Sequence, residues 1–568
     1  MSAVAAEPAA AAAGERRLPG RWSLVALILL AAALRLATLT EQGFWYDEAF
    51  TPVHVLHAGL GATLKSFVHS ENTPPLWYLL AWADARVLGD GALALRLPSA
   101  LAGIATVPVV WAIGSELSGR RAALIGAALV AVNPLFVWYS QEARAYGLLV
   151  LFAALALLCF ARLLHEPSAT RAALFALSSA LALLTHYFAV FLLVPMALWL
   201  LRERAVRRAA LPAIGVLALV GLALLPLISA QGGHGTQWIG RWALSSRLQA
   251  IPQYYLTGYS GGPLGHGVEL LVALPLLAGV LLGGWRLLAA PVRGASQSGP
   301  PSSASAPAPA HEGDSSPSRS REGAAICLWI AAFAVLAPIA LAVLGADYLA
   351  PRNLVGAMIP LSVLIAILLA AIDGLLGWLL AGAGAAAFLA IAIDVDLSPR
   401  LQRGDWRDVA KLLRAPAQAR GAGVSPGSSS GSSTAATATG AGRVLTTVEL
   451  GAAPLEYYLR GMRLHNLSRH DAVTVGEIDE TGYSPLRPGA ANPPAPGFRL
   501  LERRNVDGLI VYRFVSSIPR TVSEADLRRQ VITNAHPEVL VPSGASVSRT
   551  TAGTGSLRLQ MSSSDQNI

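Results

Sequence analysis

Residues 22–50 read WSLVALILLAAALRLATLTEQGFWYDEAF, and they give the first indication of the fold class. The apolar run from Trp22 to Leu39 is long enough to cross a bilayer, and three aromatic residues follow it at positions 44–46. Aromatic rings favour the membrane–water interface, so we expect the adjacent carboxylates Asp47 and Glu48 to lie close to the bilayer surface. From this stretch alone, a solvated acidic pair on a short loop explains them as well as a catalytic site does.

The composition of the whole chain is that of a polytopic membrane protein. Of its 568 residues, 54% are hydrophobic and only 14% are charged, whereas a soluble globular chain carries about 25% charged residues. The net charge is +9, but the basic residues are mostly arginines in short loops between apolar runs, which indicates membrane orientation rather than nucleic-acid binding. Cys159 and Cys327 both lie inside apolar runs, which excludes a disulfide framework and a Cys/His metal site. We expect no cofactor; a divalent cation is possible but is not indicated.

The first apolar run leads into Glu41 without a small-residue cleavage site, so we expect a retained span with residues 1–21 in the cytoplasm. Further spans are predicted at 97–114, 122–139, 147–164, 172–185, 188–201, 209–230, 268–288, 324–345, 354–372 and 375–393. The total is about eleven, and an odd number places the C-terminus on the opposite side from the N-terminus.

Charge in the loops supports this topology. The run 76–88 is too short to span and carries Asp84 and Arg86, so we expect an interfacial helix on the outer surface. With that choice the short outer loops hold little charge besides Arg144 and Arg352, as the positive-inside rule requires. The loops assigned to the cytoplasm carry Arg120, Arg121, Arg162, Arg171, Arg202, Arg204, Arg207 and Arg208.

The character of the chain changes after the last span. Short strand-like segments at 444–448 and 508–514 and helix-like segments at 405–413 and 454–460 predict a small α/β domain outside the membrane. We expect the chemistry to be separable from it. The predicted organisation is a cytoplasmic tail (1–21), a transmembrane domain (22–394) with a disordered cytoplasmic linker (290–322), an extracytoplasmic α/β domain (395–541) with a low-complexity run (421–442), and a disordered tail (542–568).

The conspicuous polar clusters all fall on the outer face of this topology. A guanidinium presents a fork of donors that matches phosphate oxygens, so Arg144 and Arg352 suit a lipid phosphate at headgroup depth. The alternative is that each arginine snorkels or pairs with a neighbour, Arg144 with Glu142 and Arg352 with Asp347.

Four motifs in a fixed order carry a resemblance to a known family. They are Asp47-Glu48 in the first outer loop, PPLWY at 74–78, RLPSA at 96–100, and YSQEARAY at 139–146, with Arg352 later in the chain. Over Trp22 to about Leu413, the chain resembles GT-C membrane glycosyltransferases of family 39, which include protein O-mannosyltransferases and bacterial aminoarabinose transferases. The resemblance implies a GT-C-like helical fold and the transfer of a hexose or pentose from a polyprenyl-phosphate donor to an acceptor on the outer face, with inversion.

The resemblance also implies roles for individual residues. Asp47 is the expected catalytic base, and Glu48, the other member of the catalytic pair, orients Asp47 or an arginine. Arg144 and Arg352 would bind the donor phosphate. Many relatives have a basic residue where this chain has Thr73, so Lys65 or His69 is expected to replace that contact. The other predicted substrate-binding residues are Tyr46, Glu71, Tyr78, Gln141, Glu142, Tyr146, His186 and Tyr255.

The expected partners are the polyprenyl-phosphate-linked donor, membrane lipids and an acceptor that is a protein, a lipid or a glycan, with no nucleic acid. The expected location is the cell membrane. Two other classes remain open on the sequence. A secondary transporter would place ionisable residues near the midplane of two repeated halves, and a non-catalytic scaffold would tolerate substitution of Asp47.

Overall fold

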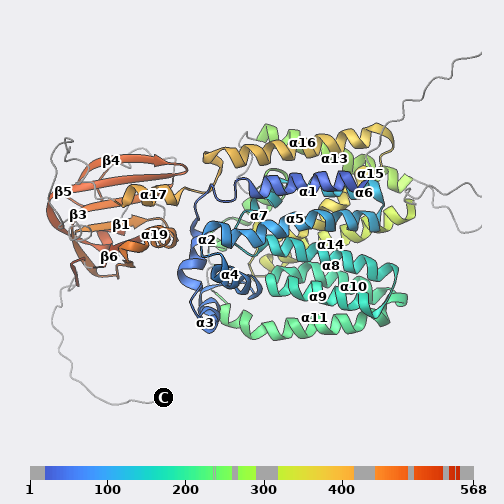
Figure 1. Ribbon diagram of the computed structural model, residues 1–568, viewed down its shortest axis with the longest axis horizontal. Coiled ribbons are helices and arrows are strands. Elements are labelled where there is room, and N and C mark those ends of the chain that lie inside the picture. Colours follow the sequence, from blue (N-terminus) through green and yellow to red (C-terminus); the bar gives the residue numbers. More distant parts are fainter. Residues whose placement is uncertain are drawn as a thin grey trace, which may run out of the picture.

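The computed structural model describes residues 20–233, 236, 238–258, 266–289, 317–414, 442–483, 492–528, 537–543 and 545–549. A large helical bundle is followed by a small sheet domain, which lies beyond one end of the bundle (Figure 1). This arrangement confirms the predicted fold class of a helical membrane protein with a C-terminal α/β domain.

The bundle contains seven long apolar helical segments within the described residues, each suited by length and composition to cross a membrane. They are α5 (Ala92–Leu117), α8 (Tyr146–His165), α11 (Arg204–Gln231), α13 (His266–Ala289), α14 (Pro317–Val343), η4 (Pro351–Ala357) with α15 (Met358–Ala370), and α16 (Gly374–Leu397). The pair α6 (Arg120–Val132) and α7 (Pro134–Ser140), bent by 57°, would make an eighth. Three shorter apolar segments, α1 (Gly20–Leu36), α9 (Ala169–Thr185) and η2 (Tyr187–Ala189) with α10 (Val190–Arg202), bring the set to about the eleven predicted.

The break between α6 and α7 has a local cause. Pro134 begins α7, where its missing N–H is not needed, and the Asn133 side chain caps the new helix by accepting from the N–H groups of Leu135 and Phe136 at 3.0 and 3.3 Å. The bent helix pair is followed by a turn, residues 141–145, which joins α7 to α8.

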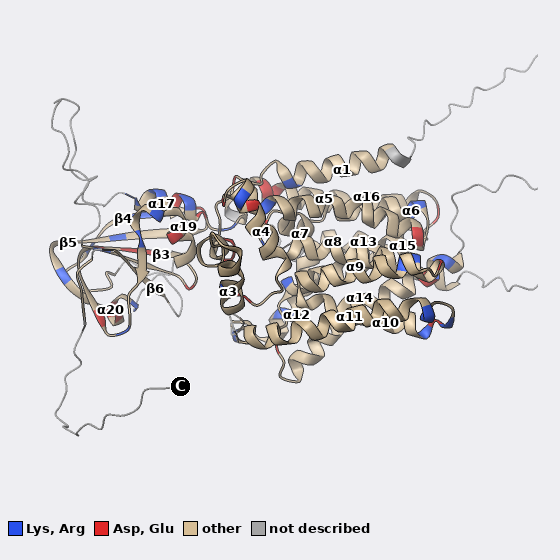
Figure 2. Ribbon diagram, turned by 60° about the horizontal axis from the view of Figure 1, so that its bottom comes forward, with Lys and Arg blue, Asp and Glu red and all other residues tan. Residues whose placement is uncertain are grey.

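Short helices cover the end of the bundle that faces the sheet. They are α2 (Tyr46–Phe50), a π-helix η1 (Thr51–Val55), α3 (Leu60–Ser70), α4 (Leu76–Val87), η3 (Ile239–Arg241) and α12 (Leu244–Thr257). Helix α4 has 12 residues, too few to span, as predicted. At the opposite end, basic residues gather in short loops, while the helices between are nearly free of charge (Figure 2).

The sheet domain begins with η5 (Pro399–Leu401) and α17 (Trp406–Leu413) and is built on one mixed sheet. The sheet has the order β2-β6-β1-β3-β5-β4; β1 is parallel to β3, the other pairs along this path are antiparallel, and β7 pairs with β3. The elements are β1 (Arg443–Thr447), α19 (Ala452–Tyr458), η6 (Arg460–Met462), β2 (Leu464–Asn466), β3 (Asp471–Tyr483), β4 (Arg499–Val506), β5 (Leu509–Ser523), α20 (Glu524–Arg528), β6 (Glu538–Pro542) and β7 (Val547–Arg549).

Two predicted boundaries differ from the observed elements. Helix α14 begins at Pro317, so the last part of the predicted linker, 317–322, is helical, and the remainder lies outside the described residues. Strand β7 lies within the predicted tail, because its residues add to the edge of β3. The low-complexity run 421–442 lies outside the described residues except for Gly442.

Candidate active site

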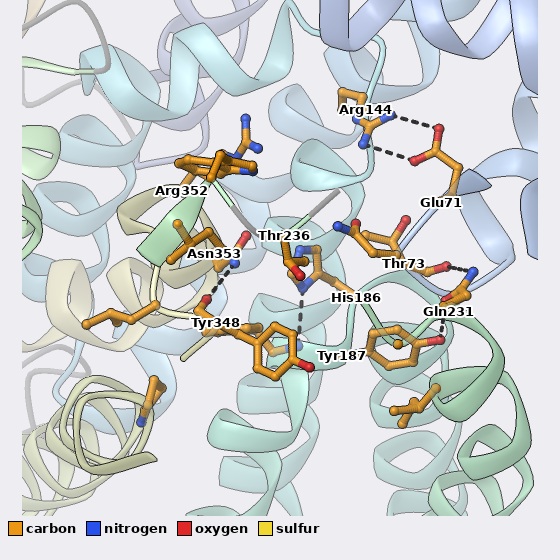
Figure 3. A pocket seen from close by; sticks show the side chains of 18 of the residues that line it. Glu71, Thr73, Arg144, His186, Tyr187, Gln231, Thr236, Tyr348, Arg352 and Asn353 are labelled. Carbon is orange, nitrogen blue, oxygen red and sulfur yellow. Dashed lines mark hydrogen bonds and ion pairs between the residues drawn. The ribbon is translucent and has the colours of Figure 1, made fainter. Parts of the chain in front are cut away.

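A cavity of about 720 Å³ lies at the end of the bundle that faces the sheet domain. Its polar wall includes Asp47, Glu71, Arg144, His186 and Arg352, which come from five separate segments. Figure 3 shows Glu71, Arg144, His186 and Arg352. Its apolar wall comes from η2, α10, α11 and α14 and includes Phe188, Val190, Phe191, Ile228, Pro338 and Leu341. The cavity is therefore amphipathic, because charged side chains and apolar residues of α10, α11 and α14 line it together.

Asp47 lies in the first turn of α2 and is ion-paired with Arg352. Arg352 Nη1 donates to Asp47 Oδ2 at 2.6 Å, and the two side chains are 21% and 15% exposed. The Arg352 guanidinium also lies 4.8 Å from the ring centre of Trp238, which restricts the cation to this side of the cavity. The acid and the cation are thus held in contact while both remain accessible from the cavity.

Arg144 lies in the turn between α7 and α8 and forms a two-pronged ion pair with Glu71. Its Nη1 and Nη2 lie 3.4 and 3.3 Å from the two carboxylate oxygens, and Nη1 also lies 3.4 Å from the carbonyl oxygen of Asp47. Burial would lower the pKa of Arg144, but Glu71, Tyr78 and Asp47 together outweigh it and raise the pKa well above the usual value. Arg144 therefore stays cationic in the cavity.

Glu48, next to Asp47, faces away from the cavity. It is fully buried, and both of its oxygens accept from Arg96, at 2.7 and 2.6 Å, while the Ala143 N–H donates to Oε1 at 2.8 Å. Burial would raise the pKa of Glu48, but Arg96 and then Arg403 hold it below the usual value. Glu48 therefore joins α2 to α5 and to the turn before Arg144, and it does not line the cavity.

Glu142 and Gln141 are also buried behind the cavity wall. Arg403 Nη2 donates to Glu142 Oε2 at 3.2 Å, and Gln141 Nε2 donates to Leu34 O and Thr38 Oγ1, both at 2.9 Å. Burial raises the pKa of Glu142 to about 7, and Arg403 offsets this only in part. Both residues hold the 139–146 motif against neighbouring segments, and neither lines the cavity.

His186 and Tyr146 line the cavity with ring centres 5.8 Å apart. The Nδ1 atom of His186 accepts from the Phe188 N–H at 3.2 Å, so the neutral ring carries its proton on Nε2. Burial, with Arg144 and Arg352 nearby, lowers the pKa of His186 to about 3. The imidazole is therefore a neutral hydrogen-bonding group at physiological pH and adds no charge to the cavity.

The structure brings together six of the predicted site residues besides His186: Tyr46, Asp47, Glu71, Arg144, Tyr146 and Arg352. The other predicted site residues lie elsewhere. Lys65 is exposed on α3 and does not line the cavity, because the same helix turns Phe67 inward; His69 is likewise exposed. Tyr78 and Tyr255 are buried, with their hydroxyls 3.0 Å from Thr73 and 3.1 Å from Ser362.

The alternative pairings considered for the two arginines are wrong. Arg144 pairs with Glu71 instead of Glu142, and Arg352 pairs with Asp47 instead of Asp347, which binds Arg247 at 2.6 Å. Sequence reasoning did not identify other lining residues, among them Tyr187, Gln231 and Asn353. Gln231, at the end of α11, accepts from the Tyr187 hydroxyl at 2.7 Å and donates to Thr73 O at 3.2 Å (Figure 3). Among the residues that the structure describes, no group of three or more His, Cys, Asp or Glu side chains is arranged to hold a metal ion.

Comparison with known proteins supports the predicted resemblance. Residues 72–230 match the family model of the dolichyl-phosphate-mannose-protein mannosyltransferases, and no curated protein matches the chain in sequence. This match confirms the resemblance to GT-C glycosyltransferases over a segment that contains Arg96, Arg144 and His186.

Several solved structures are similar to the chain. ArnT from Cupriavidus metallidurans, bound to undecaprenyl phosphate, has a TM-score of 0.49 and 12% identity, and the match covers 87% of this chain and 98% of that one. The oligosaccharyltransferase of Archaeoglobus fulgidus, solved with Zn and sulfate, has a TM-score of 0.45 and 13% identity, covering 76% of this chain and 61% of that one. The archaeal oligosaccharyltransferase AglB from Archaeoglobus fulgidus, solved with an inhibitory peptide and a dolichol-phosphate, has a TM-score of 0.39 and 13% identity, and the match covers 81% of this chain and 69% of that one.

Proposed function

We propose that this protein is an inverting membrane glycosyltransferase that moves a sugar from a polyprenyl-phosphate-linked donor to an acceptor on the outer face of the membrane. The observation that carries the proposal is the convergence of Asp47, Arg144 and Arg352 on one cavity that is apolar on its other side. The family match over residues 72–230 supports the same reaction class.

The two arginines are arranged to bind the donor phosphate. Each guanidinium lines the cavity and is neutralised by one carboxylate, Arg144 by Glu71 and Arg352 by Asp47. A phosphate that enters between them exchanges these contacts for charge-assisted hydrogen bonds to its own oxygens. Binding to Arg352 would release the Asp47 carboxylate for the acceptor, so donor binding and activation of the base would be coupled.

The chemistry then follows from these positions. The acceptor hydroxyl oxygen attacks the anomeric carbon, and Asp47 takes the hydroxyl proton. The bond between the anomeric carbon and the phosphate oxygen breaks, and its electron pair leaves with the polyprenyl phosphate. Arg144 and Arg352 stabilise the growing negative charge on that leaving group. Attack opposite the leaving group inverts the anomeric centre.

The apolar wall suits the lipid part of the donor. Val190 and Phe191 of α10 and Leu341 of α14 line the cavity on helices that are apolar enough to meet the bilayer. A polyprenyl chain placed there keeps its hydrocarbon out of water while its phosphate reaches the arginines. This division of one cavity into an ionic and an apolar side favours a lipid-linked donor over a soluble sugar nucleotide.

The transporter alternative fits the arrangement less well. The charged residues that line the cavity gather at the end of the bundle beside the sheet domain, whereas a transporter of this kind binds its substrate near the midplane. Arg35, a charged residue buried within α1, is engaged by backbone carbonyls of Ala31, Val130 and Ala131 and by Ser140, so it is structural.

The direct test uses the purified protein in liposomes with a panel of polyprenyl phosphates that carry radiolabelled hexoses or pentoses. We expect release of polyprenyl phosphate and transfer of label to an outer acceptor or to water, and no release by the Asp47→Asn variant. Uptake of label into the liposomes without cleavage of the donor would contradict the proposal and favour the transporter.

A further inference from the structure

The loop that carries Asp47 is held from two directions. From the bundle, Arg96 binds Glu48 and also donates to three carbonyl oxygens, those of Leu39 at 2.8 Å and of Gln42 and Gly43 at 3.0 Å. This contact fixes the start of the loop to α5. The residues between Gly43 and Asp47 are held by other contacts.

The C-terminal domain supplies the second attachment. The Phe44 N–H donates to the Tyr458 hydroxyl of α19 at 2.6 Å. Trp45, 5% exposed, packs in a hydrophobic cluster with residues of that domain, including Trp406, Leu455 and Leu509. The side chain two positions before Asp47 is therefore part of the core of the other domain, which differs from our expectation that this domain is separable from the chemistry.

Arg403 links this attachment to the wall of the cavity. It lies between α16 and α17 and is 7% exposed, with its guanidinium 4.1 Å from the ring centre of Trp138 and 5.7 Å from that of Trp45. Its Nη2 donates to Glu142 Oε2 at 3.2 Å and lies 3.5 Å from Trp138 O. One buried cation therefore contacts the Asp47 loop through Trp45 and the turn before Arg144 through Glu142.

We infer that Arg403 is a positioning residue that fixes Asp47 relative to Arg144 and so makes the C-terminal segment part of the catalytic architecture. This inference rests on the proposed function. Only a planar guanidinium can contact two indole faces and donate to a carboxylate in the same plane, whereas a lysine ammonium would keep the charge and lose the stacking. A shift of about 1 Å in a reacting group is enough to lower a rate by about a hundredfold.

The test compares Arg403→Met and Arg403→Lys with wild type in the full-length purified protein. Lys411→Ala is the matched control, because it removes an exposed cation on the nearby helix α17 that pairs only with Asp408 in the described structure. For each protein, single-turnover sugar transfer, donor affinity and hydrogen exchange of residues 44–50 are measured. Melting temperature reports the folded fraction.

We expect Arg403→Met to lower the single-turnover rate by about ten- to a hundredfold and to raise hydrogen exchange in the loop, with donor affinity within about threefold of wild type. Arg403→Lys should be intermediate, and Lys411→Ala should match wild type. An Arg403→Met protein with wild-type rate and loop protection would overturn the inference. So would a parallel loss of rate and donor affinity, which a general loss of structure produces.

Two further arms keep the result interpretable. If Arg403→Met fails to fold, Glu142→Gln replaces it, because this variant breaks the same ion pair and leaves the contacts of Arg403 with the two indole rings. We expect Glu142→Gln to lower the transfer rate and to raise hydrogen exchange in the loop by a smaller amount. An unchanged rate and unchanged exchange would overturn the inference. The exchange measurement does not depend on activity. A wild-type protein that transfers no sugar, together with a loosened loop in Arg403→Met, would therefore refute the proposed function and leave the anchoring intact.

Discussion

Arg352 Nη1 lies 2.6 Å from Asp47 Oδ2, so the cation proposed to bind the donor phosphate also binds the proposed base. This contact makes a prediction for Arg352. Arg352→Gln should weaken donor binding by about tenfold or more, because one charge-assisted hydrogen bond contributes about 1.5–3 kcal/mol. Donor affinity is the measurement, and Arg241→Ala is the control, because Arg241 is an exposed cation bound to Glu449 outside the cavity wall. Equal affinities for wild type and Arg352→Gln would remove Arg352 from the phosphate site.

Arg144 should behave differently because of its partner. Arg144→Ala leaves the Glu71 carboxylate, 5% exposed, without its cation, and the uncompensated charge repels a phosphate. We expect the single variant to lose more donor affinity than the double variant Arg144→Ala/Glu71→Gln, with a difference of about 1–3 kcal/mol between them. A double-mutant cycle on donor binding measures this coupling. Identical losses in the two variants would show that Glu71 has no electrostatic effect on the phosphate.

The predicted orientation is tested by labelling single cysteines in a background without Cys159 and Cys327. Arg204 lies at the start of α11, whereas Lys65 and Lys411 are exposed near the opposite end of the bundle. By the positive-inside rule, an impermeant maleimide added to intact cells should label Lys65→Cys and Lys411→Cys but not Arg204→Cys. Labelling of Arg204→Cys from outside would reverse the topology and with it the outer-face site.

A pH effect is expected in the C-terminal domain. Glu480, on β3, is fully buried in the described structure and neither of its carboxylate oxygens has a hydrogen-bond partner there. Burial raises its pKa to about 8, from about 4.3 in an unfolded chain. Between these values the native state binds more protons, so stability falls as pH rises from about 4.5 to 8, by about 3 kcal/mol at pH 7.

Glu480→Gln should flatten this dependence and stabilise the domain most at pH 8. Hydrogen exchange of β3 and β5 amides between pH 5 and 8, corrected for intrinsic rates, measures it. Burial also raises the pKa of Glu456 and Glu538. These two residues add the same pH dependence to the stability of wild type and of Glu480→Gln, so the difference between the two pH profiles reports Glu480 alone. Parallel pH profiles for wild type and variant would contradict the assignment.

The main features of the bundle were predictable because apolar run length and loop charge determine membrane insertion directly. The same predicted asymmetry identified Arg144 and Arg352, because the short loops assigned to the outer face hold few other cations. Asp47 was identified by its place after the first span and by the family motif. These residues were found because each signal is local in sequence.

The pairings within the site were not predictable in this way. Arg403 and Glu142 are separated by 261 positions, and a single sequence gives no information on which distant charges meet. Adjacent residues also diverge: the helical turn of α2 directs Asp47 to the cavity and Glu48 to Arg96, although both are acidic. Lys65 failed as a prediction for a similar reason, because the face of α3 on which a residue lies depends on what α3 packs against.

The central claim is that Asp47 acts as the base beside an arginine-bound donor phosphate. The most direct test measures donor binding and single-turnover transfer for wild type and Asp47→Asn, side by side. The asparagine keeps the shape of the side chain and loses the proton acceptor, so we expect donor affinity within a few-fold of wild type and a transfer rate lower by about a hundredfold to ten-thousandfold. An Asp47→Asn protein that binds donor and transfers sugar at nearly the wild-type rate would contradict the account.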